Sequence, residues 1–325
     1  MTSSECLAGD VVDAATAATA APALEVCDLV KRYGERTAVD RLSFTVERGR
    51  VFALLGPNGA GKTSTVETCE GFRHADGGTV RVLGLDPVRD AAALRPRVGV
   101  MPQDGGAYQG ARAAEMLRLV ARYARNPLDP EALLDMLGLR AVAHTPYRRL
   151  SGGQRQRLSL AMSVVSRPEV VFLDEPTAGL DPQARRATWE IVEALRSDGV
   201  TVLLTTHYME EAERLADQVL VIDHGRSVAT GTPSELTRSG AAGQLRFTAP
   251  PDLDLAAMVA TLPAGALASE LAPGSYLVEG PVHPQLLAAL TAWCAERNVL
   301  VAELRVERRS LEDVFLELTG RELRS

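Results

Sequence analysis

The stretch Gly56-Pro-Asn-Gly-Ala-Gly-Lys-Thr63 decides how this chain folds. It follows the apolar run Val51–Leu55, which we predict to be a strand, and it precedes a helical pattern that begins at Thr63. Glycine lets backbone N–H groups wrap around phosphate oxygens, and the start of the helix adds positive potential. We therefore predict a phosphate-binding loop in which Lys62 reaches the terminal phosphates and Thr63 ligates magnesium.

Two carboxylates end a second apolar run, Val170–Leu173. Continuous apolar runs are typical of parallel strands buried on both faces, and open α/β sheets bind ligands at the carboxyl ends of such strands. Adjacent side chains point in different directions, so we assign Asp174 to magnesium and Glu175 to polarising the water that attacks a phosphate. A solvated acidic turn is the alternative for this pair alone, but the phosphate-binding loop on the same predicted sheet favours the functional interpretation.

The stretch Leu150-Ser-Gly-Gly-Gln154 precedes a second helical pattern. Ser151 or Gly152 suits the N-cap of that helix, and exposed glycine N–H groups at a helix start bind anions. A capped surface helix is the alternative for this stretch taken alone. We interpret Arg155 and Arg157, further along the helix, as solvated charges. Because the chain carries one such stretch and one phosphate-binding loop, we predict that a second copy completes the site.

Composition excludes several classes of function. The net charge of −7 argues against a nucleic-acid backbone as the main partner, because such partners need a basic surface. The four cysteines form no Cys-x-x-Cys pair, which argues against a zinc site or a disulfide framework and favours a reducing cytosol. The longest apolar runs are far shorter than the ~20 residues that cross a bilayer. We therefore expect any membrane contact to pass through another polypeptide.

We predict three parts along the chain. Residues 1–22, rich in alanine, threonine and serine, form a disordered tail. Residues 23–238 form an α/β domain in which residues 103–167 show helical patterns, at Ala113–Ala124 and Pro130–Leu137, and make a helical subdomain. The other strands predicted in this domain are Leu24–Leu29, Leu42–Val46, Thr79–Leu83, Val98–Met101, Thr201–Thr205 and Val219–Ile222.

Residues 244–325, after a glycine-containing linker at 239–243, form a small α+β domain. Its predicted strands are Gln244–Thr248, Tyr276–Glu279 and Leu300–Val306, and its predicted helices are Asp254–Leu262, Pro284–Arg297 and Ser310–Thr319. The last helix has a capping-box start at Ser310 and Asp313 and a glycine stop at Gly320. The order suggests a split β-α-β layer with a dimerisation or regulatory role.

The motifs together resemble the nucleotide-binding subunit of an ATP-binding-cassette (ABC) transporter, over the range from Leu24 to Thr237. The resemblance implies a P-loop NTPase fold, with a RecA-like α/β core, antiparallel β strands and a helical subdomain. It implies that Tyr33 stacks on adenine, and that Gln103 touches magnesium and couples to the membrane subunit. It also places Asp181 in a loop that communicates across a dimer, and makes His207 a contact of the γ-phosphate.

Three residue groups follow from these motifs and the resemblance. The nucleotide-binding residues are Tyr33, Gly56, Pro57, Asn58, Gly59, Ala60, Gly61, Lys62, Thr63, Ser64, Gln103, Ser151, Gly152, Gly153, Gln154 and Asp181. The catalytic residues are Lys62, Glu175 and His207, and the magnesium ligands are Thr63, Gln103 and Asp174. Three of these residue types have plain structural alternatives, namely a packing aromatic for Tyr33, a loop amide for Gln103 and a structural histidine for His207.

The C-terminal stretch Ser310–Gly320 is similar to that of bacterial drug-export ATPases of the daunorubicin-resistance type, whereas residues 104–111 depart from their usual acidic segment. The resemblance implies ATP and Mg²⁺ as cofactors, a homodimer, and a separate integral-membrane permease that contacts the transported small molecule. It implies a peripheral bacterial protein on the cytoplasmic face of the membrane. An importer subunit is one alternative. A non-transport ATPase in translation or DNA maintenance is another, which the single cassette, the acidic charge and the absence of sustained heptads disfavour.

Overall fold

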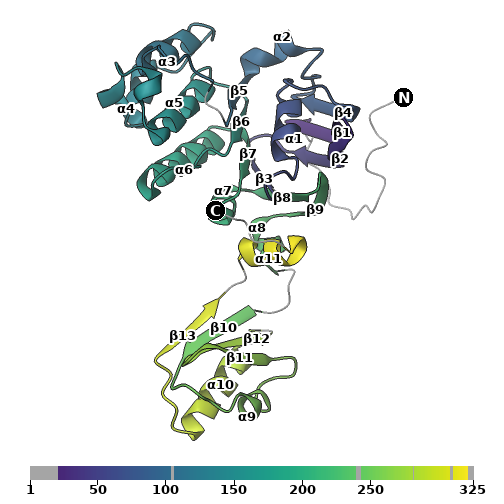
Figure 1. The fold of residues 1–325 in the computed structure, drawn as a ribbon, viewed down its shortest axis with the longest axis vertical. Coiled ribbons are helices and arrows are strands. Elements are labelled where there is room, and N and C mark those ends of the chain that lie inside the picture. The colour runs from purple at the N-terminus through teal and green to yellow at the C-terminus, as the bar shows by residue number, and fades with distance from the viewer. Residues whose placement is uncertain (1–20, 104–105, 239–242, 281, 308–309, 321–325) are drawn as a thin grey trace. The chain divides into compact units, whose positions relative to one another are not determined.

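The computed structural model describes residues 21–103, 106–238, 243–280, 282–307 and 310–320 (Figure 1). The described residues form two compact units, one that ends at Thr232 and one that begins at Pro233. Residues 1–20 of the predicted tail lie outside the described residues. The units part before helix α8 (Pro233–Arg238), which the sequence interpretation had assigned to the first domain.

A six-stranded sheet forms the core of the first unit, with strand order β5-β6-β7-β3-β8-β9. All its neighbouring strands are parallel except β8 and β9, which pair antiparallel. Its strands are β3 (Val51–Leu55), β5 (Val98–Met101), β6 (Val170–Asp174), β7 (Thr201–Thr206), β8 (Gln218–Asp223) and β9 (Arg226–Gly231). The sequence did not predict β9, because its half-exposed edge position leaves it without an apolar pattern.

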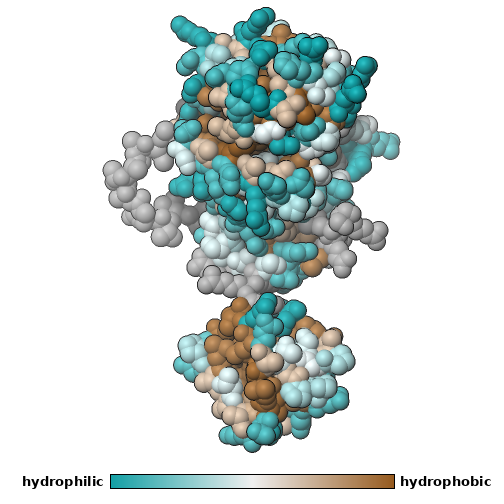
Figure 2. Space-filling model, turned by 90° about the vertical axis from the view of Figure 1, so that its left-hand side faces the viewer, coloured by the Kyte–Doolittle hydropathy of each residue, from teal (hydrophilic) through white to brown (hydrophobic). Residues whose placement is uncertain are grey.

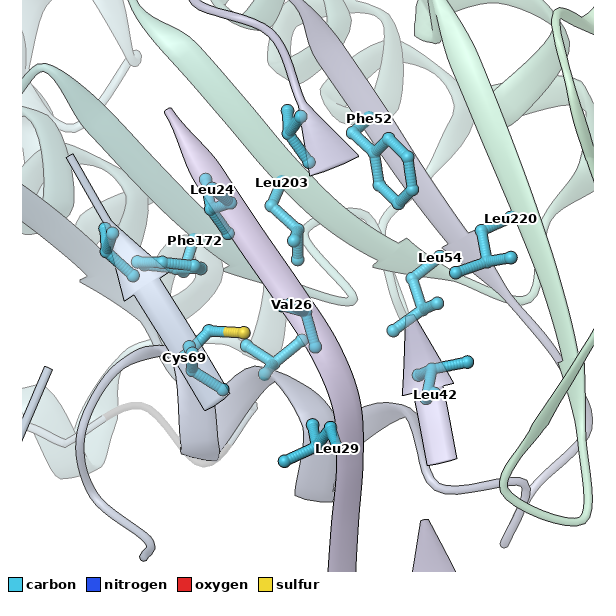
Figure 3. Close-up of a cluster of buried hydrophobic side chains, with 14 of the residues drawn as sticks. Leu24, Val26, Leu29, Leu42, Phe52, Leu54, Cys69, Phe172, Leu203 and Leu220 are labelled. Atoms are coloured by element: carbon cyan, nitrogen blue, oxygen red, sulfur yellow. The ribbon is translucent and has the colours of Figure 1, made fainter. Parts of the chain in front are cut away.

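A three-stranded antiparallel sheet packs against this core, with strand order β2-β1-β4. Its strands are β1 (Leu24–Tyr33), β2 (Arg36–Val46) and β4 (Gly77–Val82). Both β1 and β2 continue past the predicted apolar runs into a polar hairpin. Figure 3 shows side chains of the two sheets meeting in one apolar cluster, with Val26 and Leu42 from one sheet and Phe172 and Leu203 from the other. This packing holds the hairpin beside the core sheet.

Helices connect and cover the strands of the first unit. They are α1 (Lys62–Cys69), α2 (Ala91–Leu94), α3 (Ala113–Ala121), α4 (Pro130–Met136), α5 (Gly152–Val164), α6 (Pro182–Ser197) and α7 (Met209–Leu215), with 3₁₀ turns at Arg95–Arg97, Arg140–Val142 and Tyr147–Arg149. Helices α3, α4 and α5 form a helical group between β5 and β6 in the chain (Figure 1).

The arginines of α5 correct one sequence interpretation, because Arg155 and Arg157 are not solvated charges. Arg155 donates to the backbone carbonyls of Tyr147 and Arg148, at 3.2 and 2.7 Å. Arg157 donates to the carbonyl of Leu137 at 2.8 Å. These guanidinium groups bind the carbonyls at the end of α4 and in the turn before α5, so charge-assisted hydrogen bonds fix both segments to α5.

The second unit is a four-stranded antiparallel sheet with strand order β11-β12-β10-β13. Its elements are β10 (Gly243–Thr248), α9 (Leu255–Val259), β11 (Leu267–Ala272), β12 (Ser275–Gly280), α10 (Pro284–Glu296), β13 (Glu303–Glu307) and α11 (Leu311–Thr319). This β-α-β-β-α-β order is a split β-α-β unit. Strand β11, exposed along most of its length, was not predicted, and α9 and β13 are shorter than expected.

Candidate functional site

The loop between β3 and α1 needs glycine at two of its positions. A Cβ atom on Gly56 would lie 2.4 Å from the carbonyl oxygen of Ile222, in β8. Gly61 has a φ of 104°, and a Cβ atom there would lie 2.4 Å from the carbonyl oxygen of Ala38, in β2. Space excludes a side chain at both positions, and the left-handed backbone also disfavours one at Gly61. The loop is therefore held against β2 and β8, and α1 begins directly after it.

Lys62 is buried at the first position of α1. Its ammonium donates to the carbonyls of Gly56 and Pro57, at 2.6 and 3.2 Å. Burial lowers the pKa of Lys62, while the negative charges of Glu175 and Asp174 oppose that change. The Lys62 ammonium and the free N–H groups at the N-terminus of α1 are the hydrogen-bond donors that a phosphate group needs.

Asp174 ends β6 and is buried. The Thr205 hydroxyl, on the neighbouring strand β7, donates a short hydrogen bond to its carboxylate. Burial raises the pKa of Asp174, and the Thr205 hydrogen bond and the Lys62 charge oppose that rise. One carboxylate oxygen of Asp174 is thus held by Thr205 of β7, at the edge of the sheet where the parallel strands end. A cation bound there would stabilise the charged form of Asp174.

Glu175 has a φ of 50°, a left-handed conformation that is uncommon for a residue other than glycine. Its backbone is fixed on both sides, because its N–H donates to the Thr205 carbonyl and hydroxyl, at 3.2 and 3.0 Å. Its own carbonyl accepts from the Gln156 amide at 2.8 Å. The left-handed backbone at Glu175 is thus held by contacts on both sides, and the two carboxylates have different neighbours.

The Glu175 carboxylate faces two of the other predicted site residues. His207 Nδ1 lies 3.4 Å from Glu175 Oε1, and the Gln103 amide donates to Glu175 Oε2 at 3.5 Å. The hydrogen bond with His207 is the main cause that lowers the pKa of Glu175, and the Lys62 charge lowers it further. The carboxylate is therefore ionised and able to accept a proton from a water molecule.

A cavity of about 410 Å³ brings many of the predicted residues together. It is lined by Tyr33, Arg36, Ala38, Asn58, Gly59, Gly61, Lys62, Thr63, Ser64, Gln103 and Glu175. Tyr33 is 42% exposed, with Lys31 Nζ 5.5 Å and the Arg73 guanidinium 6.0 Å from its ring centre, so it does not pack in the core. The ring stands in the cavity wall, available for stacking.

Arg36 is a residue of this cavity that the sequence analysis missed. It begins β2 after the hairpin turn, and its guanidinium lies 3.4 Å from the carbonyl oxygen of Gly59. An arginine three positions after Tyr33 was the available signal, but only the fold of the β1–β2 hairpin brings it to the phosphate-binding loop. It adds a second cation to the cavity.

The remaining predicted residues lie elsewhere. Ser151 is the N-cap of α5, where its hydroxyl accepts from the Gln154 N–H at 3.3 Å and its N–H donates to the Gln154 side chain at 2.9 Å. Asp181 caps α6 by accepting from the Gln183 and Ala184 N–H groups, at 3.0 and 2.9 Å. The structure thus gives Ser151, Gln154 and Asp181 capping roles and does not place them, nor Gly152 and Gly153, on the cavity of their own chain.

A buried carboxylate near the loops that carry Glu175 and His207 was also missed. Glu211, in the first turn of α7, is fully buried and accepts from the Trp189 indole N–H at 3.1 Å. Burial raises the pKa of Glu211, and the hydroxyls of Thr206 and Thr177 oppose that rise. Thr206 directly precedes His207 and Thr177 follows Glu175 by two residues, so Glu211 lies close to the two loops that carry these side chains.

Comparison with known proteins identifies the family. A family model described as ABC transporter matches residues 39–178. The Nod factor export ATP-binding protein I of Ralstonia nicotianae is 42% identical over 309 residues, which cover 93% of this chain and 95% of that protein. The chain belongs to the ABC transporter family. The daunorubicin resistance ATP-binding protein DrrA3 of Streptomyces coeruleorubidus is a further relative, 38% identical over 92% of this chain and 96% of that protein.

Solved structures agree that the chain has the fold of an ABC transporter ATP-binding subunit. The structure described as the ATP binding subunit of an ABC transporter has a TM-score of 0.61 and 28% identity, and covers 66% of this chain and 92% of that chain. The predicted α/β P-loop fold of the ABC type is therefore confirmed. So is the prediction that the chain is an ATP-binding subunit with ATPase activity, and both followed from the motifs at Gly56–Thr63 and Asp174–Glu175.

Proposed function

We propose that this chain hydrolyses ATP between two paired copies and thereby drives a separate membrane permease that exports a small hydrophobic molecule. The names of both relatives above refer to export or drug resistance, which favours export over import. The observation that carries the hydrolytic part is the 410 Å³ cavity, which joins Lys62, Gln103 and Glu175 on one surface. The acidic net charge of −7 fits a partner other than nucleic acid.

In the proposed reaction, the residues of the cavity and the adjacent His207 bind different parts of ATP. Tyr33 stacks on the adenine, and Lys62 exchanges its two carbonyl partners for phosphate oxygens. Glu175 orients the attacking water and accepts its proton, while the adjacent His207 holds the γ-phosphate. The lowered pKa of Glu175 keeps the carboxylate in its charged form for this step.

The residues at the carboxyl edge of the sheet fit a magnesium ion. Thr63 and Gln103 line the cavity, and the buried Asp174 carboxylate has a hydrogen bond to one oxygen and a pKa raised by burial. Mg²⁺ takes oxygen ligands and binds through one or two protein groups plus phosphates. Thr63, Gln103 and Asp174 would hold the ion, which would neutralise phosphate charge.

A second copy supplies the other half of the proposed site. Ser151 and Gly152 are exposed at the start of α5, and Gly153 and Gln154 are half-buried. The N-terminus of a thirteen-residue helix offers backbone N–H groups and positive potential to an anion. Because these residues lie off the cavity of their own chain, the γ-phosphate is bound when the Ser151–Gln154 stretch of the partner faces it. The exposed Asp181 is proposed to lie at the same interface.

A separate groove of about 650 Å³ is proposed to receive the permease. It is lined by residues of β5, α3 and α5, and by Phe72 and Tyr123, which are 63% and 84% exposed. Arg95, Arg125 and Arg167 also line it, so it suits a cytoplasmic segment with apolar and acidic side chains. Pro102 and Gly106 line the groove on either side of Gln103 in the chain, which connects it to the cavity.

The permease also accounts for the proposed location on the cytoplasmic face of the membrane. Within the described ranges, the structure contains no helix whose length and apolarity would let it span a bilayer. We propose that the chain is a peripheral protein, attached through the 650 Å³ groove, and that the transported molecule contacts mainly the permease.

The test compares two substitutions that remove different steps. Glu175→Gln keeps the shape of the side chain but removes the proton acceptor, so turnover is expected to fall by about 10²–10⁴-fold with ATP binding retained. Lys62→Ala removes the buried cation and is expected to weaken ATP binding itself. Equilibrium binding of a fluorescent ATP analogue and steady-state phosphate release measure the two effects. Normal hydrolysis by Glu175→Gln would contradict the proposed base.

A further inference from the structure

Strand β13 is exposed over residues 303–306. It is a terminal strand of the second unit's sheet and pairs with β10 on one side. Its apolar side chains, Leu304 and Val306, are 37% and 51% exposed, and the nearby Leu300 is 78% exposed. Figure 2 shows apolar side chains gathered on this unit. A terminal strand with exposed apolar residues and unpaired backbone groups is a template for pairing with another chain.

The apolar side chains lie on the face that helices α9 and α10 cover elsewhere. Leu304 pairs with Phe247 and Val306 pairs with Leu245, and residues directly opposite on antiparallel strands share a face. Phe247 and Leu245 are buried in a cluster with side chains of α9 and α10, such as Met258, Leu290 and Trp293. Among the described residues, Leu304 and Val306 do not belong to this cluster, so the apolar layer continues to the edge of the sheet with these side chains partly exposed.

We propose that β13 pairs antiparallel with β13 of a second copy, around a two-fold axis that passes through Leu304. In this register Leu304 lies opposite the partner's Leu304, and Val306 lies opposite the partner's Ala302, which extends the apolar layer across both copies. On the other face Glu303 lies opposite the partner's Arg305, and Arg305 opposite the partner's Glu303. The strand therefore complements itself in both shape and charge.

Neighbouring registers do not have this property. A register centred on Arg305 sets two arginines opposite each other, and one centred on Glu303 sets two glutamates opposite each other, which is destabilising. A shift by one residue would set the apolar face of one strand against the polar face of the other. In the chain as it stands, Arg305 Nε donates to Glu303 Oε1 at 2.6 Å. Both side chains are more than half exposed, so this pair exchanges readily for the one between copies.

The contact adds to the proposed function because it joins two copies before nucleotide binds. It rests on the proposed pairing of two copies, although it needs neither ATP nor the Ser151–Gln154 stretch. A single strand pair buries less than the roughly 1,200 Å² of a stable interface, so the nucleotide-free association is expected to be weak. Linking two cassettes in this way raises the effective concentration of each for the other when ATP arrives.

The first test is cross-linking of the nucleotide-free full chain. Because the two-fold axis passes through position 304, Leu304→Cys places two thiols opposite each other, and a short bifunctional thiol reagent is expected to give a covalent dimer. Leu267→Cys, on the other terminal strand β11, is the matched control, since Leu267 is 66% exposed and is expected to stay unlinked. The unsubstituted chain reports any reaction of the native cysteines. Absence of a Leu304→Cys dimer, or an equally efficient Leu267→Cys dimer, would overturn the inference.

The second test reverses the charges in the Leu304→Cys background. Glu303→Arg or Arg305→Glu alone sets two like-charged pairs across the axis, so cross-linking is expected to fall about five- to tenfold. The double variant restores opposite charges and is expected to recover the dimer. A double variant as weak as the single ones contradicts the pairing. If Glu175→Gln still dimerises with ATP while nucleotide-free Leu304→Cys does not cross-link, this inference fails and the proposed ATP-bound dimer stands.

Discussion

Burial acts in opposite directions on the charged residues around the phosphate-binding loop. It lowers the pKa of the Lys62 ammonium and raises the pKa of the Asp174 carboxyl, and each charge partly offsets the other. Glu70, directly after α1, belongs to the same buried region. Burial raises its pKa to about 8, with further contributions from the Asp174 and Glu67 charges, and its Oε1 atom is buried without a hydrogen-bond partner. No role in the proposed reaction follows for this carboxyl, so its effect is on stability.

We predict that Glu70→Gln stabilises the protein at alkaline pH. The folded pKa of about 8 exceeds the unfolded value of 4.5, so the folded state retains a proton that the unfolded state loses between these values. The Glu70 contribution to stability is therefore fully present below about pH 4.5 and is lost as the pH rises through about 8. The variant is expected to gain about 1–3 kcal/mol at about pH 8 and little at about pH 5.

Thermal unfolding of the nucleotide-free protein across this pH range measures the difference between Glu70→Gln and the unsubstituted chain. Glu47→Gln, at an exposed carboxyl, is the control and is expected to change stability by less than about 0.5 kcal/mol at each pH. A difference for Glu70→Gln that does not grow with pH would show that its carboxyl titrates normally.

Whether an element could be predicted from the sequence depended on where its contacts lie. Strand β3 coincides with its predicted range, because a strand buried on both faces leaves a continuous apolar run. Strands β9 and β11, whose side chains are mostly exposed, carry no such pattern. The residues of the candidate site fall into the same two groups, those that the sequence predicted and those that it did not. Motif residues of contiguous loops were found, whereas Arg36, Gln156 and Glu211 act through contacts between segments far apart in the chain.

The close contact between β5 and α5 leads to a prediction that the spacing of motifs in the sequence could not give. A Cβ atom on Gly99, in β5, would lie 1.9 Å from the carbonyl oxygen of Ser163, in α5. Backbone must move to relieve this overlap, so Gly99→Ala is expected to destabilise the first unit by about 3 kcal/mol or more. Gly110→Ala is the control, since a Cβ atom there meets nothing within 4 Å, and it is expected to stay within about 0.5 kcal/mol. Urea unfolding monitored by circular dichroism measures both, and similar midpoints for the two variants would contradict the close packing.

At the scale of the whole molecule, one chain holds two incomplete halves of the proposed hydrolytic site. Its cavity provides the cations and the base, while its Ser151–Gln154 stretch does not line that cavity. The hydrogen bond from Gln156 to the Glu175 carbonyl connects α5, which begins at this stretch, with the base of the same chain. A shift of α5 on binding the phosphate of a partner would therefore change the position of the Glu175 backbone. This connection provides a physical link between the two proposed sites of a dimer.

We predict that Ser151→Arg blocks ATP-driven dimerisation while sparing ATP binding by the monomer. The substitution places a long cation at the exposed start of α5, in the interface that the phosphate of the partner would occupy, at a residue that does not line the cavity of its own chain. In the Glu175→Gln background, sedimentation with and without ATP measures dimerisation. We expect the ATP-dependent gain in dimer to fall at least about tenfold, which corresponds to 1.4 kcal/mol.

The substitution also removes the N-cap of α5, which costs about 1 kcal/mol of stability. Ser310→Arg controls for that loss, because Ser310 caps α11 with the same capping box and accepts from the Asp313 N–H at 3.2 Å. Dimerisation with ATP is expected to survive Ser310→Arg. A Ser151→Arg protein that still dimerises with ATP would show that the triphosphate does not require the α5 stretch of a second copy, and the proposed arrangement of two copies around it would then be wrong.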